Sequence, residues 1–410
     1  MNNTPITLFG YGLTTKAIAK HYGPATFFDD NVTKPFRDDA ENALKPSAEF
    51  NAKYSRLEVP SPGIPPQHPL IRQAQNLFSE YDLFFGDRSP YALEKKPFNI
   101  WISGTNGKTT TTQMLQHLLS EKGSLAGGNI GTPLAELDKE APIWILETSS
   151  FTLHYTDEAS PNIYLLLPIA PDHLSWHGSY EAYCKAKLKP LASMREGEVA
   201  IVPKAFSDVE TDAFLITYDS GEELASYFGI ETNKVKFKGA FLLDAIMAMG
   251  VEKVLYDTID YEKMNAFELD PHRQEELHDA QGRLWVNDTK ATNIDAALAA
   301  VTRYKTKHIH LILGGDDKGV ELTPLFEALQ EFDVEIYTLG SNQARLDDLA
   351  ARYNIPFSSS GSIDKAVDNI SKKLDHDSVG LLSPAASSLD QFPSYAVRGE
   401  RFKEAVAKLS

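Results

Sequence analysis

The sequence predicts an α/β fold made of three domains in series. Three times along the chain, short apolar runs alternate with helical patterns, and glycine turns or polar loops separate them. Strands and helices that alternate in this way are typical of parallel sheets covered by helices. The length of 410 residues fits two to four domains of about 100–200 residues each. We expect the domains to span residues 1–88, 89–270 and 271–410.

The composition excludes several other classes of protein. The hydrophobic fraction of 42% and the charged fraction of 24% are those of a globular chain, not of a disordered or fibrous one. The net charge of −17 argues against a protein that coats nucleic acid, since phosphate contacts need basic patches. Cys184, the single cysteine, has no partner for an internal disulfide, and no cysteines and histidines have zinc-site spacing. No targeting or membrane-spanning pattern is visible, so we expect a cytoplasmic protein with neither a membrane nor a nucleic-acid partner.

The first domain opens with a strand, a glycine turn and a helix. Gly10 and Gly12 occupy the first two positions of the dinucleotide-binding pattern, but its third glycine is replaced by Thr15. Asp29 and Asp30 follow the second strand about 20 residues on, where such a site carries an acidic residue. These residues leave three interpretations open: a dinucleotide site, a site for another nucleotide, or a structural turn. The strands of this domain are expected at 6–9, 25–28 and 56–59.

The second domain contains a phosphate-binding loop between an apolar strand and a helix. In such a loop glycines let backbone N–H groups approach phosphate oxygens, and the helix N-terminus favours negative charge. Lys108 would reach the terminal phosphates, and the Thr109 hydroxyl can bind Mg²⁺. The spacing departs from the usual pattern, because Ile102 stands where the first glycine is expected. The residues expected to contact ATP here are Gly104, Thr105, Asn106, Gly107, Lys108, Thr109 and Thr110.

Two more polar residues follow predicted strands of the second domain. Glu147 comes directly after an apolar run, and His173 follows another in the sequence Asp172-His173. Since the carboxyl ends of parallel strands line the ligand crevice of an open sheet, we expect both residues near the phosphate loop. Oxygen ligands with one imidazole suit Mg²⁺ or Mn²⁺. The strands are expected at 98–102, 143–146 and 163–167.

The third domain repeats the alternation of strands and helices, which predicts a second parallel sheet. Its strands are expected at 284–288, 308–313, 334–339 and 379–382.

Seven separated motifs, in order, resemble those of the Mur ligases. They span nearly the whole chain. So many separated motifs in the family's order make the resemblance specific, whereas a single motif would not. The last of them resembles the members of the family that add D-glutamate. The motifs are Gly104–Thr110, Glu147–Phe151, Asp172–Leu174 with Tyr183 and Lys187 downstream, Pro271–Arg273, Asn287–Asn293, Gly314–Lys318 and Leu382–Phe392.

The resemblance implies an ATP-dependent amide ligase of peptidoglycan synthesis, with roles in cell-wall growth, cell shape and cell division. Its reaction would join D-glutamate to UDP-N-acetylmuramoyl-L-alanine through an acyl phosphate, releasing ADP and phosphate. It implies a Rossmann-like UDP-binding domain, a central P-loop ATPase-like domain and a Rossmann-like C-terminal domain. It also implies two Mg²⁺ sites, with Mn²⁺ as an alternative, and carbamylation of Lys187. We expect a monomer.

The resemblance also implies roles for individual residues. The catalytic residues would be Lys108, Glu147, His173 and Lys187, and the metal ligands Thr109, Glu147, His173 and Lys187. Beyond the phosphate loop, ATP would contact Asn129, His272, Arg273 and Asp288. The UDP substrate would contact Leu13, Thr14, Asp30, Asn31, Ser61, Gly63, Asn129, Ser149 and His173. D-Glutamate would contact Lys290, Thr292, Lys318, Ser388, Leu389 and Tyr395.

The chain departs from the family pattern at a few positions. Thr152 replaces a glutamine, Phe241 and Asp244 replace two asparagines, and Asn31 stands where the family has a cationic residue. These changes affect contacts to the nucleotide and the uracil rather than the reaction.

Three other functions compete with this interpretation. A related ligase could add another amino acid or build folylpolyglutamate, but a folate enzyme would not need a UDP-sized first domain. An NAD-linked dehydrogenase would use the Gly10 turn and Asp29 or Asp30, but leaves Lys108 and Glu147 unexplained. A non-catalytic nucleotide-binding module would be expected to have lost its metal-binding and activating groups, which are all present.

Overall fold

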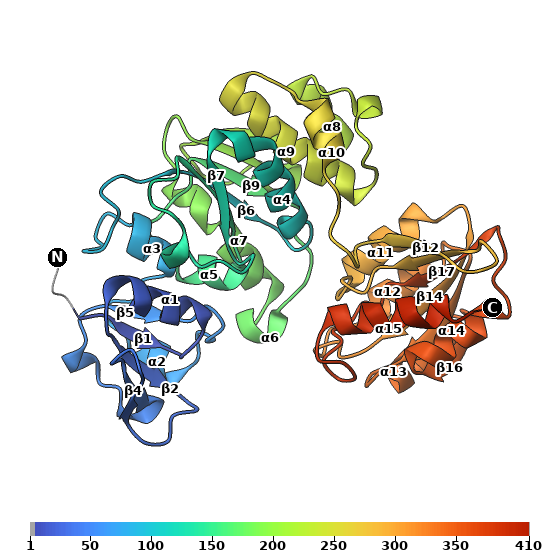
Figure 1. The fold of residues 1–410 in the computed structure, drawn as a ribbon, viewed down its shortest axis with the longest axis horizontal. Helices are drawn as coiled ribbons and strands as arrows, with labels where there is room; N and C mark the ends of the chain where they lie inside the picture. The colour runs from blue at the N-terminus through green and yellow to red at the C-terminus, as the bar shows by residue number, and fades with distance from the viewer. Residues whose placement is uncertain (1–4, 410) are drawn as a thin grey trace. The chain divides into compact units, whose positions relative to one another are not determined.

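The computed structural model describes residues 5–409. The chain divides into two compact units, Met1–Phe267 and Glu268–Ser410 (Figure 1). The first unit contains two β-sheets and the second contains one. The α/β fold class with three mainly parallel sheets is confirmed, whereas the limits of three separate domains stay a prediction. Within the described residues, no helix is long and apolar enough to cross a membrane.

The first sheet has the strand order β3-β4-β2-β1-β5, and only the pairing of β3 with β4 is antiparallel. The strand β1 is buried along its length, as expected inside a covered sheet, and the edge strand β5 is buried as well. The strands are β1 (Thr7–Phe9), β2 (Thr26–Asp29), β3 (Phe36–Arg37), β4 (Ala43–Pro46) and β5 (Glu58–Pro60). The helices are α1 (Leu13–Tyr22), α2 (Pro69–Gln73) and α3 (Glu80–Phe85), with 3-10 turns at Ser47–Glu49 and Ala52–Tyr54.

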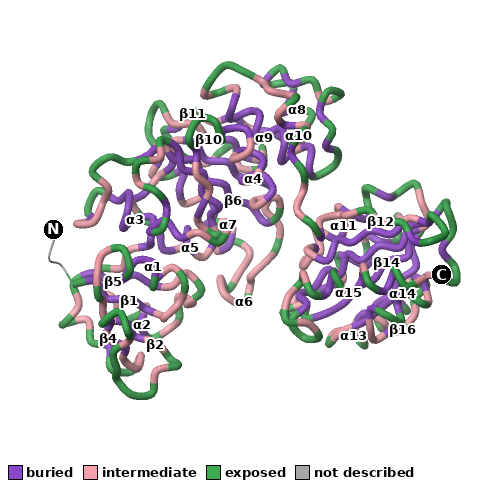
Figure 2. Tube along the Cα trace, viewed as in Figure 1, coloured by how far each residue is buried: buried purple, intermediate pink, exposed green. Residues whose placement is uncertain are grey.

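The second sheet is entirely parallel and has the order β11-β10-β9-β6-β8-β7. Its central strands carry large, fully buried side chains, among them Trp101, Trp144 and Tyr164. The buried strands and exposed loops of this sheet stand out in Figure 2. The strands are β6 (Phe98–Ser103), β7 (Ser124–Gly128), β8 (Ile143–Glu147), β9 (Ile163–Leu166), β10 (Val199–Pro203) and β11 (Phe214–Tyr218).

The helices of the region around the second sheet alternate with its strands along the chain. The apolar residues of α4 predicted for one face, such as Met114, Leu115 and Leu118, are buried. The helices are α4 (Lys108–Leu119), α5 (Ser150–Tyr155), α6 (Leu174–His177), α7 (Tyr180–Ser193), α8 (Gly221–Phe228), α9 (Ala240–Tyr256) and α10 (Tyr261–Ala266). Shorter 3-10 turns lie at Ser120–Lys122, Leu134–Glu136, Lys204–Phe206 and Thr232–Lys234.

The sheet of the second unit has the order β12-β13-β17-β14-β15-β16. It is parallel except for the edge strand β12, which pairs antiparallel with β13, whereas the sequence predicted a wholly parallel sheet. Helices cover both faces, over two separate apolar clusters. The strands are β12 (Glu275–His278), β13 (Leu284–Asn287), β14 (His308–Gly314), β15 (Val334–Leu339), β16 (Phe357–Gly361) and β17 (Ser378–Leu382). The helices are α11 (Ile294–Arg303), α12 (Thr323–Leu329), α13 (Gln343–Arg352), α14 (Ile363–Ser371) and α15 (Tyr395–Ala407).

Candidate active site

The loop between β6 and α4 has the backbone of an anion-binding turn. Gly104 and Gly107 have φ angles of 141° and 83°, which residues with side chains rarely adopt. A Cβ atom on Gly107 would also collide with the carboxylate of Asp244. Lys108 Nζ donates to the carbonyl oxygens of Gly104 and Thr105, at 3.0 and 2.9 Å. The loop therefore encloses the ammonium group at the N-terminus of α4, where an anion is electrostatically favoured.

The other residues of the loop differ in their exposure. Thr105 is buried, and its hydroxyl lies 3.0 Å from the hydroxyl of Tyr183. Asn106 is exposed and Thr109 is half-buried. Thr110 is buried, and within residues 5–409 its hydroxyl has no hydrogen-bond partner.

Lys187, on α7, points toward the phosphate loop between β6 and α4. Its side chain is 1% exposed, and its Nζ donates to the carbonyl oxygen of Gly104 at 2.7 Å. Burial, together with the neighbouring charge of Lys108, holds the pKa of the Lys187 amine well below its usual range. A neutral amine is the form that reacts with CO₂, so the surroundings suit the predicted carbamate chemically.

Glu147, the last residue of β8, presents a carboxylate oxygen that lacks a protein partner. The residue is 3% exposed, and its Oε1 accepts a hydrogen bond from Asn129 Nδ2 at 2.8 Å. Its Oε2 is buried and accepts no hydrogen bond from any described residue. Burying such an oxygen costs free energy unless a donor or a cation compensates. A divalent cation with oxygen ligands would satisfy it.

His173 lies at the start of α6, in the left-handed conformation with φ of 51°. Its Nε2 is 3.5 Å from Asp172 Oδ2, and its ring centroid is 4.7 Å from that of Phe151 on α5. Ser149, which caps α5, lies with its hydroxyl 3.0 Å from that of Thr152. Thr152, one of the departures from the family pattern, therefore contacts a predicted substrate residue.

The strand order explains why these groups meet. The strands β9, β6 and β8 are neighbours, and the phosphate loop, Glu147 and the Asp172–His173 segment all follow their carboxyl ends. The charges of Lys108, Asp172 and Glu147 all act on Lys187. The structure thus brings together Lys108, Glu147 and Lys187, and places His173 beside Asp172, whose charge acts on Lys187.

A cavity of about 350 Å³ opens at the carboxyl ends of the strands of the first sheet. Of the residues predicted to contact the UDP substrate, four line it: Asp30, Asn31, Ser61 and Gly63. Leu13 and Thr14, at the start of α1, are not among the lining residues, and Leu13 is 64% exposed.

Two further polar residues of this cavity were not predicted from the sequence. Ser47 and His68 both line it, and His68 Nε2 lies 3.0 Å from Asp30 Oδ2. The neighbouring polar side chains of Ser47 and His68 lower the pKa of Asp30, so the cavity holds a charged carboxylate. Neither residue belongs to a motif; only the chain path past β4 and β5 brings them to Asp30.

The glycine turn beside this cavity needs only two glycines. Gly10 has a φ of 80°, and a Cβ there would lie 3.1 Å from Ser61 Cβ. Thr15, in place of the third glycine, donates from its hydroxyl to the carbonyl of Gly10 at 2.6 Å and accepts from the N–H of Gly12 at 3.1 Å. The threonine therefore closes the turn with its own side chain.

Two hydrogen bonds tie the wall of this cavity to the helices beside the phosphate loop. Tyr155 of α5 donates to the carbonyl oxygen of Ile64 at 2.5 Å, and Trp176 of α6 donates to that of Gly63 at 3.0 Å. A long substrate in the cavity would therefore lie next to the elements that carry Ser149 and His173.

In the second unit, the residues predicted to contact D-glutamate lie on loops after three neighbouring strands, β13, β17 and β14, except Tyr395, which begins α15. Two backbone hydrogen bonds join the loops after β14 and β17, between Asp316 and Ser387 at 2.9 and 2.8 Å. Lys290 Nζ lies 5.3 Å from the ring centroid of Tyr395. Ser388 is buried, Thr292 is half-buried, and Lys318 and Leu389 are exposed.

Arg398, on α15, connects these loops and was missed by the sequence analysis. It is 1% exposed and donates to Thr289 Oγ1 at 2.8 Å and to the carbonyl oxygens of Thr289 and Ala386 at 2.8 and 3.0 Å. A longer bond of 3.4 Å reaches the carbonyl of Gly314. Burial lowers the pKa of this guanidinium to about 10, which still leaves it charged at neutral pH. Arg398 therefore fixes the three loops relative to one another.

The residues of the second unit predicted to contact ATP lie near the carboxyl end of β13, where Asp288 follows the strand. Asp288 accepts from Ser383 Oγ at 2.9 Å and from the backbone N–H of Gln274, and burial raises the pKa of its carboxyl to about 7. His272 Nδ1 lies 2.8 Å from Asn287 Nδ2. Arg273 Nε is buried, and no described residue accepts a hydrogen bond from it. These groups lie within the second unit, and their role in binding ATP stays a prediction.

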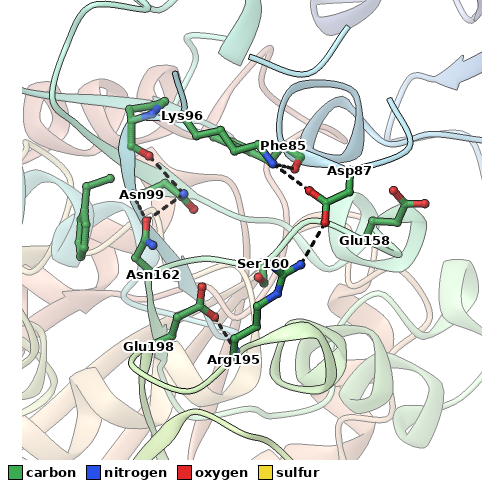
Figure 3. A pocket seen from close by; sticks show the side chains of 11 residues that line it. Phe85, Asp87, Lys96, Asn99, Glu158, Ser160, Asn162, Arg195 and Glu198 are labelled. Carbon is green, nitrogen blue, oxygen red and sulfur yellow. Dashed lines mark hydrogen bonds and ion pairs between the residues drawn. The ribbon is translucent and has the colours of Figure 1, made fainter. Parts of the chain in front are cut away.

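A second cavity of about 350 Å³ lies at the opposite, amino ends of β6 and β9 (Figure 3). Three of its charged side chains pair with one another, Asp87 with Lys96 at 3.2 Å and with Arg195 at 3.0 Å. No residue predicted for the active site lines it. We therefore do not assign the reaction to this cavity.

Comparisons with known proteins agree with the motifs. Residues 102–243 match the Mur ligase middle domain. The UDP-N-acetylmuramoylalanine--D-glutamate ligase of Campylobacter jejuni (strain 81-176) is 52% identical over 98% of this chain and 100% of its own length. The enzyme of that name from Helicobacter pylori (strain HPAG1) is 46% identical over 98% of this chain and 99% of its own length.

A solved structure is similar in fold. The MurF ligase of Thermotoga maritima in complex with ADP superposes with a TM-score of 0.54, at 18% identity, over 87% of this chain and 96% of that one. At this identity the likeness concerns the fold alone. The full-length similarity to the curated relatives carries the assignment: the chain belongs to the Mur ligases, and among them to the UDP-N-acetylmuramoylalanine--D-glutamate ligases.

Proposed function

We propose that this chain is an ATP-dependent ligase that joins D-glutamate to UDP-N-acetylmuramoyl-L-alanine in peptidoglycan synthesis. The full-length similarity to relatives of that name supports the activity. The single structural observation that supports it most is the buried, unsatisfied Oε2 of Glu147 beside the phosphate loop and the buried Lys187.

The reaction has two chemical steps. A carboxylate oxygen of the UDP substrate attacks the γ-phosphorus of ATP, and ADP leaves, which gives an acyl phosphate. The amine of D-glutamate then attacks the acyl carbon, and phosphate leaves from the tetrahedral intermediate. Both steps develop negative charge on phosphate oxygens, so they need positioned cations and donors more than covalent help.

The residues of the phosphate loop supply part of this charge neutralisation. When ATP enters, Lys108 can exchange its carbonyl partners for the terminal phosphates, since its ammonium already lies within the loop. Backbone N–H groups from Gly104 to Thr110 and the N-terminus of α4 would hold the phosphate oxygens. Asn129, which donates to Glu147, would lie beside the nucleotide and the substrate.

Four residues would hold Mg²⁺, or Mn²⁺ in its place, at two sites: Thr109, Glu147, His173 and Lys187 as its carbamate. The unpartnered oxygen of Glu147 and the neutral amine of Lys187 fit this assignment. The bound ions would neutralise the phosphate charge during transfer. Carbamylation would replace an amine with an anion, and so turn Lys187 into an oxygen ligand.

The other substrate contacts follow the elements described above. The cavity of the first sheet would take the uridine diphosphate, with Asp30, Asn31, Ser61 and Gly63 at its wall. Leu13 and Thr14 directly follow Gly12, which lines the cavity, and would contact the same substrate. Ser149 and His173 would lie toward the muramoyl part. In the second unit, His272, Arg273 and Asp288 would contact ATP, and the loops fixed by Arg398 would present Lys290, Thr292, Lys318, Ser388, Leu389 and Tyr395 to D-glutamate. We also propose that the enzyme acts as a monomer in the cytoplasm, where its nucleotide substrates are made.

Steady-state kinetics with the three substrates test this function. We expect ADP release to require both UDP-N-acetylmuramoyl-L-alanine and D-glutamate, and L-glutamate to be used at least about 100-fold less efficiently. Inverting the α-carbon would displace the amine from the acyl carbon while both carboxylates stay bound, and so lose the alignment that catalysis requires.

Two results would contradict the proposal. Equal kcat/KM for both enantiomers would place the amino-acid site elsewhere. ADP release driven by a folate, or hydride transfer with NAD in place of ATP hydrolysis, would support one of the competing functions.

A further inference from the structure

A cluster of two histidines and a glutamate lies far from the predicted D-glutamate loops, at the amino end of β14. We call His308, His310 and Glu335 the His–Glu cluster. His308 and His310 are two residues apart on one strand, so their side chains leave the same face of the sheet. Glu335, on β15, pairs with His310 in the sheet register. One potential ligand atom from each residue lies within 4.8 Å of the others.

Neighbouring side chains orient both imidazoles of the cluster. His308 Nδ1 lies 2.8 Å from Asp333 Oδ1, and a carboxylate in that position holds a ligand ring in place and leaves Nε2 for a metal. His310 Nδ1 lies 3.3 Å from the hydroxyl of Tyr337. The same nitrogen lies 3.8 Å from Glu335 Oε2, so the ring already faces the carboxylate of the cluster.

The cluster already attracts a cation. Lys373 Nζ lies 2.6 Å from Glu335 Oε1, although the side chain of Lys373 is 57% exposed and can move into water. Asp333 and Asp375 also face the histidines. Three carboxylates, those of Asp333, Glu335 and Asp375, therefore surround one lysine, which leaves negative charge for a further cation.

We propose that the His–Glu cluster is a binding site for a zinc-type divalent cation, held by one nitrogen of each imidazole and one oxygen of Glu335. Zinc bonds to such ligands are about 2.0–2.2 Å long, which places tetrahedral ligand atoms about 3.4 Å apart. The ligand atoms lie within 4.8 Å of one another, so they need to approach by at most about 1.4 Å, chiefly by rotation of the half-buried His308. Three protein ligands leave a fourth position for water, and the bound ion would cross-link β14 and β15 at the end opposite the Gly314 loop.

The site is separate from the proposed Mg²⁺ site, because all of its residues lie in the second unit. Imidazole nitrogens favour Zn²⁺ and related ions over Mg²⁺, which prefers oxygen ligands. Excess Mg²⁺ should therefore fill the proposed active-site positions without filling the His–Glu cluster.

Calorimetric titration of the metal-free full-length protein with ZnCl₂, in excess Mg²⁺, tests the proposal. We expect one saturable Zn²⁺ site per chain, and at least tenfold weaker binding in both His308→Ala and His310→Ala. His308 is half-buried, so its variant is expected to fold even if the His310 variant does not. His278→Ala, at an exposed position on the edge strand β12, is the matched control and should bind like the wild type.

A charge variant sharpens the test. Lys373→Ala removes the competing ammonium and should tighten Zn²⁺ binding several-fold, whereas a purely structural cluster would bind no metal in either form. Absence of saturable binding in the wild type and in Lys373→Ala would overturn the proposal. So would unchanged Zn²⁺ affinity in His308→Ala, because the ion would then bind elsewhere.

Discussion

Replacement of Glu147 by glutamine is expected to lower kcat at least about 10²- to 10³-fold, as the loss of one well-placed electrostatic group does in other active sites. Glutamine retains an oxygen that can accept from Asn129, so the local fold should persist. It removes the negative charge that the buried Oε2 offers to a cation. Lys108→Ala should cause a loss of the same order, because it removes the ammonium from the phosphate loop.

The affinity for the UDP substrate separates this effect from general damage. Glu147 and Lys108 do not line the cavity of the first sheet. The dissociation constant of the UDP substrate should therefore change less than about threefold in either variant. Glu140→Gln, at an exposed position before β8, is the control and should have wild-type kcat. Full activity in Glu147→Gln would contradict the assignment of Glu147 to the site of phosphate transfer.

Lys187→Ala is expected to abolish measurable turnover, and a small carboxylate such as acetate should restore part of it. The alanine variant leaves a space beside Gly104 that a carboxylate can enter, with the charge that a carbamate would carry. In the wild type, the lowered pKa of Lys187 favours the neutral amine that reacts with CO₂. Removal of CO₂ from the buffer should therefore reduce wild-type activity reversibly, and a fall in pH should do the same because it protonates the amine.

The control for this prediction lies on the same helix. Lys185→Ala, two residues earlier and exposed, should retain activity and should not respond to acetate. Mass spectrometry of the intact protein at high bicarbonate would report the carbamate directly. Wild-type kcat in Lys187→Ala would end the assignment.

Most apolar strands could be predicted from the sequence, although β10 and β11, which are also mainly apolar, were not. β6, β8, β9, β14, β15 and β17 are buried runs of aliphatic and aromatic residues, and each was predicted within one or two residues. β7, which reads Ser-Leu-Ala-Gly-Gly, was not predicted, because small residues and glycines resemble a turn. β4 contains a lysine and a proline, and β16 is mostly serine, so only their partners in the sheet define them.

The predicted site followed from motifs that are contiguous in the sequence. The phosphate loop, Glu147 and His173 each follow a predictable strand, so the topology of a parallel sheet was enough to expect them together. His68 and Arg398 could not be found in this way, because their partners are 38 and 109 residues away. The His–Glu cluster escaped for the same reason: Glu335 meets His310 only through the pairing of β14 with β15.

The most direct test of the proposed mechanism follows the oxygen atoms of the substrate carboxylate. UDP-N-acetylmuramoyl-L-alanine labelled with ¹⁸O at both carboxyl oxygens would be incubated with ATP and D-glutamate, and the inorganic phosphate analysed by mass spectrometry. An acyl phosphate intermediate transfers one labelled oxygen to each phosphate and leaves the other in the new amide. Phosphate without ¹⁸O would contradict activation of the carboxylate by ATP.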